Sequence, residues 1–224
     1  MAPGTAPTSS GGGTVNLTFS DQEIRDLAIA WLALGLAFTL LLEPQLTGVL
    51  LGTAAGVPLS TIGQTLVVSL LTVGVAFLLH ELAHKIVAVR FGQVAAFKAD
   101  YRMLGFAIVG ALVGFLFAAP GAVVHRGRIT LKENGLIALA GPVTNIGLAV
   151  VFLVPYLAFA ASGVGGFLWE LASRGLQINL LLAGFNMLPF GPLDGRKVRE
   201  WNTGVFVAVA VPSILLGFGA LFVL

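Results

Sequence analysis

The chain has 224 residues, of which 57% are hydrophobic and only 10% are charged, and its mean hydropathy is +0.98. A soluble domain carries about a quarter charged residues, so this composition indicates a multi-pass integral membrane protein whose surroundings are the lipid bilayer. The chain has no cysteine, which excludes disulfides, thiolate metal ligands and thiol nucleophiles. The net charge of +2 is too small to indicate a nucleic-acid partner.

Residues 1–20 are expected to form a flexible N-terminal tail, because they are mostly small and uncharged and lack the basic start and apolar core of a signal peptide. Residues 21–224 are expected to form one transmembrane domain, with its core at about 62–200. Ser20 and Glu23 have the spacing of a capping box, which predicts that a helix begins there. Six apolar runs follow, each close to the ~20 residues that cross a bilayer as a helix. They are about Leu27–Leu42, Ile62–Val89, Met103–Val124, Gly135–Ala161, Leu168–Leu188 and Thr203–Leu224.

The distribution of Lys and Arg favours five crossings over six. If every run except Met103–Val124 crosses once and the N-terminus is cytoplasmic, eleven basic residues lie inside and only Arg174 lies outside. If that run also crossed, the basic residues of 126–132 and 196–199 would lie outside. We therefore expect this glycine-rich run to be re-entrant and to follow a short strand or hairpin at 93–102. The predicted fold class is an all-α polytopic membrane protein of five to six transmembrane helices, with a small strand or re-entrant segment between the second and third crossings.

The second apolar run contains the motif His-Glu-x-x-His, formed by His80, Glu81 and His84. Residues four apart share one face of a helix, so both imidazoles can bind one metal ion. Glu81 can then reach a water on that ion and act as a general base. A single histidine in an apolar helix more often makes only a hydrogen bond to a neighbouring helix. Here two of the three histidines have metal-ligand spacing at a depth where polar groups are costly, which favours a metal site.

Asp194 is the best candidate for the third ligand that a catalytic zinc usually takes. It follows a segment broken by Pro189 and Pro192 and flanked by glycines, which can turn a side chain inward. With five crossings, His84 and Asp194 lie toward the same side of the membrane, so metal geometry and charge distribution predict the same topology. The alternative is that Asp194 only forms a turn in Pro-Leu-Asp-Gly. His125, in a basic connection, is expected to be a solvated loop residue.

Two asparagines within the apolar runs are candidates for contact with a substrate. Asn186 lies eight residues before Asp194, and Asn145 follows Gly-Pro in the fourth run. Each could donate to an oxyanion or bind the substrate backbone near the metal. Alternatively, a buried amide in a membrane helix simply bonds a neighbouring helix. The three tryptophans fit an interfacial belt or plain packing. They are Trp31, Trp169 and Trp201.

These motifs together resemble the site-2 protease family of intramembrane zinc metalloproteases. His-Glu-x-x-His in one helix, Gly-Pro-Val-Thr-Asn in the next and Phe-Asn-Met-Leu-Pro-Phe-Gly-Pro-Leu-Asp-Gly closing a third occur in that family's order, and the resemblance covers about Val67–Arg199. In that family the two motif histidines and the aspartate of Leu-Asp-Gly bind zinc, the motif glutamate activates water, and an upstream asparagine lies near the scissile peptide. The residues that match are, in the same order, His80, His84, Asp194, Glu81 and Asn186.

The chain departs from the family pattern at several points. It has Gly-Pro-Leu-Asp-Gly where the family often has Asn-Pro-Asp-Gly, and Ala83 replaces a frequent glycine of the first motif. No PDZ or CBS regulatory domain is expected in the remaining residues. Met103–Val124 occupies the position where family members carry membrane-associated strands or a re-entrant loop. The resemblance therefore implies that an unwound substrate adds as a strand at this edge.

The sequence predicts an intramembrane zinc endopeptidase, with one Zn²⁺ per chain, that cuts a transmembrane protein substrate near the cytoplasmic side. The alternative is a non-proteolytic metal-binding membrane protein or a transporter. A transporter predicts paired carboxylates or histidines spread along several helices and some pseudo-repeat, and the sequence has neither. A catalytically inactive scaffold is a third class, and the intact Glu81 argues against it.

Overall fold

The computed structural model describes residues 16–115 and 120–223, so most of the predicted N-terminal tail lies outside the described residues. The described chain is mostly helical and contains one small antiparallel sheet. The helices are α1 (Asp21–Leu42), α2 (Pro44–Leu50), α3 (Leu59–Ser69), the π-helical turn η1 (Leu70–Gly74), α4 (Val75–Arg90), α5 (Tyr101–Leu112), α6 (Leu131–Ser162), α7 (Phe167–Asn186), α8 (Asp194–Trp201) and α9 (Thr203–Val223), and the strands are β1 (Val94–Ala99) and β2 (Gly121–Arg126).

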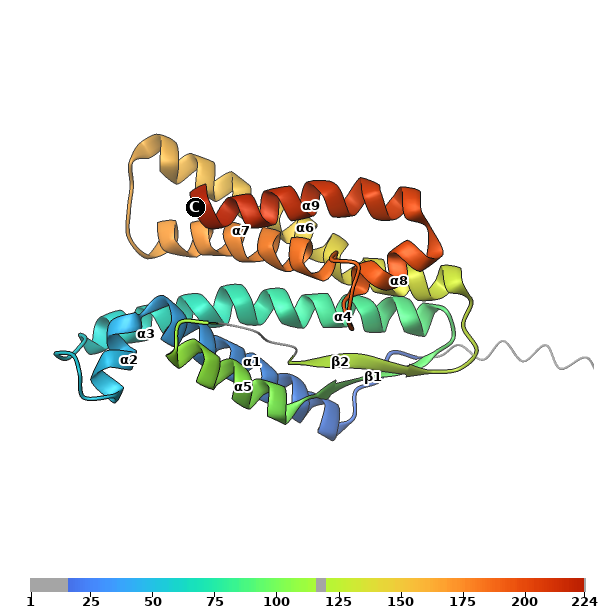
Figure 1. Ribbon diagram of the computed structural model, residues 1–224, viewed down its shortest axis with the longest axis horizontal. Helices are drawn as coiled ribbons and strands as arrows, with labels where there is room; N and C mark the ends of the chain where they lie inside the picture. The colour runs from blue at the N-terminus through green and yellow to red at the C-terminus, as the bar shows by residue number, and fades with distance from the viewer. Residues whose placement is uncertain (1–15, 116–119, 224) are drawn as a thin grey trace, which may run out of the picture.

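One long helix runs through the middle of the molecule and separates two layers (Figure 1). This central helix, Leu59–Arg90, is α3, η1 and α4 in direct continuation. Helices α6, α7, α8 and α9 lie on one side of it, and α1, α5 and the hairpin of β1 and β2 lie on the other (Figure 1). The half of the central helix that carries His-Glu-x-x-His therefore lies between α6 and the hairpin, and α4 contacts both.

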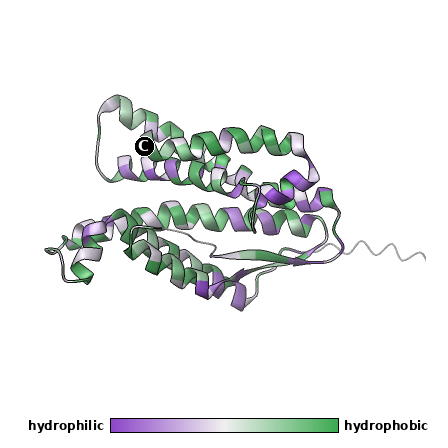
Figure 2. Ribbon diagram, in the orientation of Figure 1, coloured by the Kyte–Doolittle hydropathy of each residue, from purple (hydrophilic) through white to green (hydrophobic). Residues whose placement is uncertain are grey.

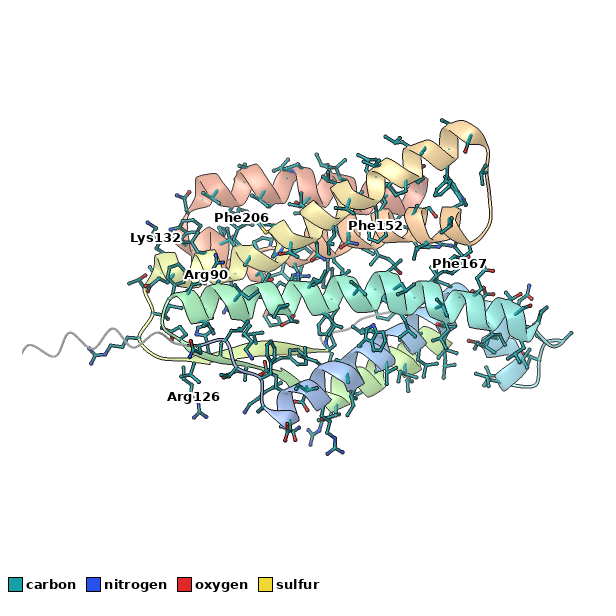
Figure 3. The ribbon with its side chains drawn as sticks, turned by 180° about the vertical axis from the view of Figure 1, so that it is seen from behind. Arg90, Arg126, Lys132, Phe152, Phe167 and Phe206 are labelled. Atoms are coloured by element: carbon teal, nitrogen blue, oxygen red, sulfur yellow. The ribbon has the colours of Figure 1, made fainter. Side chains whose placement is uncertain are left out.

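The apolar runs form the helices that the sequence predicts. Among the described residues, four helices are long and apolar enough to cross a membrane, namely α1, the central helix, α6 and α9. The fifth predicted crossing forms α7, a 20-residue helix that is not among these four. Figure 2 shows hydrophobic residues along most of the helix lengths and polar residues gathered around α8 and the start of α1. Figure 3 shows Arg90, Arg126 and Lys132 at one end of the molecule, where α4 and β2 end and α6 begins.

The segment between the second and third predicted crossings folds back on itself. Strands β1 and β2 pair antiparallel, with Val94 opposite Arg126 and Ala99 opposite Gly121. The chain therefore leaves β1 and enters β2 at the same end of the sheet, with α5 between the two strands in sequence. This agrees with the prediction that Met103–Val124 makes no simple crossing, but the run is divided into a helix and a strand.

Two carboxylates of α1 cover the outer edge of β1. The Ser20 hydroxyl accepts the Glu23 N–H and begins α1 as predicted. The Glu23 carboxylate instead turns into the core, where it accepts the Phe97 N–H at 2.9 Å, and Asp26 accepts the Ala99 N–H at 3.1 Å. A further strand could not pair with β1 without displacing α1. The opposite edge of the hairpin, formed by β2, faces α4.

A buried ion pair fixes α1 against α4. The Lys85 ammonium donates to both Glu23 carboxylate oxygens, at 2.7 and 2.6 Å, and both side chains are buried. It also donates to the Thr18 carbonyl and lies 3.7 Å from the centre of the Phe19 ring. Lys85 directly follows the second motif histidine, so this pair links the metal-binding motif, α1 and, through Glu23, strand β1.

Candidate metal centre

The two motif histidines lie side by side on the buried face of α4. Helical spacing brings their Nε2 atoms to 3.0 Å from each other, and both rings are buried. Two ring nitrogens this close repel one another unless a proton or a metal ion lies between them. The pair alone is therefore a candidate for metal binding.

The far nitrogens of both rings are held by acceptors on α6. His80 Nδ1 lies 2.6 Å from Asn145 Oδ1, and His84 Nδ1 lies 2.7 Å from the carbonyl oxygen of Ile137. A carbonyl oxygen accepts only, so each Nδ1 carries the proton. The lone pairs then lie on the two Nε2 atoms, which face each other. Neutral imidazole with a free Nε2 is the form that binds metal ions.

Asn145 is itself oriented by two further acceptors. Its amide nitrogen donates to Asn179 Oδ1 at 3.0 Å and to the Ala76 carbonyl at 3.3 Å, while Asn179 donates to the Gly175 carbonyl at 2.8 Å. These bonds turn Oδ1 of Asn145 toward His80. Asn145 has no exposed surface and lies behind His80 rather than along the cavity, so its contacts are those of a residue that orients the imidazole.

Asp194 completes the cluster from a different part of the chain. Its Oδ2 lies 3.3 Å from His80 Nε2 and 3.2 Å from His84 Nε2. Asp194 is the first residue of α8, after a turn in which Gly191 has a φ of 63°. A β-carbon at Gly195 would overlap the Met187 carbonyl, so only glycine allows α8 to begin this close to the end of α7. The prediction that His84 and Asp194 meet on one side agrees with this arrangement.

Gly141 lets α6 approach the two imidazoles closely. A β-carbon at Gly141 would overlap the Nε2 atoms of both His80 and His84. The next residue, Pro142, is also buried in α6. The Gly-Pro-Val-Thr-Asn motif thus supplies the space for the imidazoles at Gly141 and an acceptor for one of them at Asn145.

The donor set fits a zinc ion. Two imidazole nitrogens and one carboxylate oxygen are common zinc ligands, and bonds of ~2.0–2.1 Å in a tetrahedron separate the ligand atoms by about 3.3 Å. The three atoms of this cluster are separated by 3.0, 3.2 and 3.3 Å. His80, His84 and Asp194 can therefore hold the ion and leave a fourth position open. Glu81 also offers an oxygen within 4.8 Å of the two histidines.

Glu81 lies between the cluster and strand β2. Its Oε2 accepts the Val123 N–H at 3.2 Å, which orients the carboxylate from the hairpin side. Glu81 lines a cavity of about 160 Å³ together with His80, His84 and Asp194. This volume is well above the ~10–15 Å³ that one water requires, so the cavity has room for a water and a peptide group.

His125 and Lys197 also line this cavity, and sequence reasoning missed both. His125 lies in β2 rather than in a loop, and it shares the half-buried face of the strand with Gly121 and Val123. Burial lowers the pKa of the His125 ring, and the nearby Lys197 ammonium lowers it further. A neutral ring can donate or accept a hydrogen bond. The alternation of residues along 121–126 is the sequence signal that could have indicated this orientation.

Asn186 lies along the wall of the cavity. Its amide donates to the Leu182 carbonyl at 2.9 Å, one turn earlier in α7. Of the two predicted asparagines, the structure therefore brings Asn186 to the cavity and Asn145 to the far side of His80. Their roles toward a substrate stay predictions.

The chain is similar to several proteins that are named as zinc metalloproteases. It is 40% identical over 199 residues to "Putative zinc metalloprotease MJ0611" of Methanocaldococcus jannaschii, and the aligned region covers 88% of this chain and 93% of that protein. It is 36% identical over 145 residues to "Putative zinc metalloprotease YwhC" of Bacillus subtilis, covering 58% of this chain and 66% of the relative. It is 33% identical over 127 residues to "Putative zinc metalloprotease Rip3" of Mycobacterium tuberculosis, covering 56% of this chain but 28% of the relative. No protein-family model and no solved structure matches the chain significantly.

Proposed function

The chain belongs to the zinc metalloprotease family that these relatives represent, and we propose that it is an intramembrane zinc endopeptidase. The proposed reaction is hydrolysis of a peptide bond in a transmembrane protein substrate near the cytoplasmic side. The observation that carries the proposal is the cluster of His80, His84 and Asp194 in one cavity with Glu81. An enzyme of this kind is an integral membrane protein, and we propose that its N-terminus is cytoplasmic.

The proposed metal is one Zn²⁺ per chain, held by His80, His84 and Asp194. When bound, zinc lowers the pKa of a water ligand toward neutrality and polarises a carbonyl oxygen. The protein contributes two neutral imidazoles, oriented by Asn145 and the Ile137 carbonyl, and one carboxylate. These orienting hydrogen bonds raise the basicity of the ligands and hold their rings in place.

Glu81 is the proposed general base. Its carboxylate takes a proton from the attacking water as the water oxygen bonds to the scissile carbonyl carbon. The carbon–nitrogen bond then breaks, and Glu81 returns the proton to the leaving amine. The Val123 N–H holds the carboxylate beside the cavity during both transfers. Asn186 and His125, which line the same cavity, are the proposed polar contacts to the substrate backbone.

The edge of β2 that faces away from β1 and lies beside Glu81 is the proposed docking position for the substrate, which would compete with Glu81 for the Val123 N–H. A peptide bond in a transmembrane helix is shielded by the helical hydrogen bonds, so the substrate must unwind locally before cleavage. An extended segment can pair with an open strand edge. The outer edge of β1 is covered by Glu23 and Asp26, whereas residues Gly121–Val123 of β2 line the cavity beside Glu81.

A second, apolar cavity supports a substrate that comes from the membrane. This cavity of about 410 Å³ lies between α1, the central helix, α7 and α9, and Leu182 and Phe185 line both cavities. An apolar segment can therefore approach the polar site from the lipid side. The basic residues at one end of the molecule, Arg90, Arg126 and Lys132, support a cytoplasmic position for that end (Figure 3).

The proposal is tested with the full-length protein in proteoliposomes and a reporter that carries a transmembrane segment. Wild type is expected to cleave the reporter and to lose activity with a zinc chelator. Glu81→Gln is expected to bind zinc at wild-type stoichiometry but to cleave about 10²–10⁴-fold more slowly, the usual contribution of a general base. Glu200→Gln, at an exposed carboxylate paired with Arg196, is the matched control and should cleave as wild type does.

Cleavage by Glu81→Gln at the wild-type rate would refute the proposed mechanism. A wild-type protein that binds zinc but leaves every tested peptide bond intact, in helical and in unwound substrates alike, would favour the non-proteolytic alternative. Zinc content that stays at zero in wild type would overturn the metal site itself.

A further inference from the structure

The buried residues of the central helix lie in two rows with a strict spacing of four. One row runs from Thr65 to Lys85 and contains Glu81, and the other runs from Val68 to Ala88 and contains both motif histidines. Within Leu59–Arg90, all of which the structure describes, Gly74 is the one buried residue outside these rows. The same two rows therefore face the protein interior from the first turns of the helix to the metal site.

A regular α-helix cannot keep rows of this spacing on one face. Four residues of an α-helix turn through about 400°, so each step moves the row about 40° around the axis. Five steps from Thr65 to Lys85 would turn it by about 200°, to the opposite side of the helix. A π-helical turn contains about one extra residue and so removes about 100° of this rotation. The remaining ~100° is the width of an ordinary buried face.

The π-turn η1, Leu70–Gly74, lies between the two halves of these rows. It begins ten residues before His80, in the middle of the helix. The metal ligands therefore point toward α6 because the chain accommodates an extra residue at this turn. Without the turn, the second half of the helix would be rotated by about 100° relative to the first.

Trp31 of α1 contacts the π-turn directly. Its indole N–H donates to the Leu70 carbonyl at 3.0 Å, and this carbonyl is the first of the turn. The ring also fills the space beside Gly74, where a β-carbon would overlap it. A π-turn weakens the regular helical hydrogen bonds, so an external donor at its first carbonyl stabilises it.

We propose that the π-turn at Leu70–Gly74, held by Trp31, sets the rotation that brings His80 and His84 to the metal centre. Trp31 is in this view a positioning residue, because it acts on the metal ligands only through the backbone of the central helix. This proposal rests on the metal site of the proposed function. The tests below distinguish a failure of the π-turn role from a failure of the proposed function.

The first test measures the affinity of the purified full-length protein for Zn²⁺ by competition with a chromophoric chelator. Deletion of Leu71, an exposed residue of the π-turn, restores a regular α-helix and is expected to weaken Zn²⁺ binding at least hundredfold. Deletion of Ser60, which is also exposed, shortens the helix before both rows begin. The Zn²⁺ affinity of this variant should lie within twofold of that of wild type. Affinity within twofold of wild type after deletion of Leu71 would overturn the role of the π-turn.

The second test does not depend on the folding of a deletion variant. Trp31→Phe keeps an aromatic side chain, though a smaller one, and removes the N–H, and the loss of one hydrogen bond is expected to weaken Zn²⁺ binding about fivefold. Trp169→Phe is the matched control, because that ring stacks on Tyr156 outside the central helix, and it should bind as wild type does. The Co²⁺ absorption spectrum and the unfolding midpoint of the metal-free protein are recorded for each variant.

Equal Zn²⁺ affinities of the Trp31→Phe and Trp169→Phe proteins would overturn the role of Trp31, even if the unfolding midpoint of Trp31→Phe fell. In that case the residue would only stabilise the fold. A change of the Co²⁺ spectrum in Trp31→Phe alone would support the positioning role. A wild-type protein that binds no Zn²⁺ would instead overturn the proposed function.

Discussion

Replacing Asn145 by leucine tests whether the polar contacts behind His80 determine metal binding. Leucine has nearly the shape of asparagine but neither accepts from His80 Nδ1 nor donates to Asn179 and the Ala76 carbonyl. The His80 ring then loses the acceptor that places its proton on Nδ1. We expect the fold to persist, because an apolar side chain replaces a fully buried amide.

The expected size of the effect follows from the position of this bond. Hydrogen-bond partners of a metal-binding histidine typically contribute 10–100-fold to metal affinity. At 2.6 Å and with no exposed surface, the bond between His80 and Asn145 is at the strong end of this class. We therefore expect Asn145→Leu to bind Zn²⁺ between ~10-fold and ~100-fold more weakly, which corresponds to about 1.4–2.7 kcal/mol.

Competition with a chelator measures this change in the full-length protein. Asn145→Asp retains an acceptor for His80 and should bind Zn²⁺ more tightly than Asn145→Leu. Thr144→Val is the control, since the Thr144 hydroxyl only donates to a carbonyl in its own helix. Zinc affinity of Asn145→Leu within twofold of wild type would refute the reasoning, because the bond would then not orient the ligand.

Three further outcomes can be checked. Lys85→Met leaves the buried Glu23 carboxylate without its ion-pair partner and should lower the free energy of unfolding by about 3–5 kcal/mol. The double variant Lys85→Met/Glu23→Leu should recover part of that loss. Equal unfolding midpoints for the single and the double variant would contradict this expectation. Gly141→Ala should reduce zinc stoichiometry, because the added methyl group would overlap both imidazoles. Gly147→Ala is the control and should bind zinc as wild type does, because the space beside Gly147 is open. The same zinc content in both variants would argue against the close approach of α6. Asp194→Ala should lose stoichiometric zinc in metal analysis, and full retention would remove it from the ligand set.

Glu23 shows that a local motif can be interpreted correctly while the main role of one of its side chains stays unseen. The spacing of Ser20 and Glu23 predicts a helix start, and α1 begins there with Ser20 as its cap. The Glu23 side chain does not follow from that motif. It binds Lys85, 62 residues away, and the Phe97 N–H, 74 residues away, because helix packing brings these groups to it.

The sequence by itself determined the features that depend on local periodicity and on charge. Hydropathy located the long helices, helical spacing placed His80 and His84 on one face, and the basic residues indicated that Met103–Val124 returns to its own side. That topology predicted that Asp194 lies on the same side as the histidines, and the structure has its carboxylate 3.3 and 3.2 Å from their Nε2 atoms. Each of these conclusions needs only neighbouring residues or the direction of the chain.

Only the tertiary structure decided which side chains meet across helices and what each one faces. It placed Asn145 behind His80 instead of along the cavity, and His125 in the cavity wall instead of in a loop. It also revealed the π-turn at Leu70–Gly74, which no residue pattern had indicated. The physical reason is that the rotation of one helix against another depends on packing between residues far apart in the chain, and a change of one residue in a helical turn moves every following side chain by about 100°.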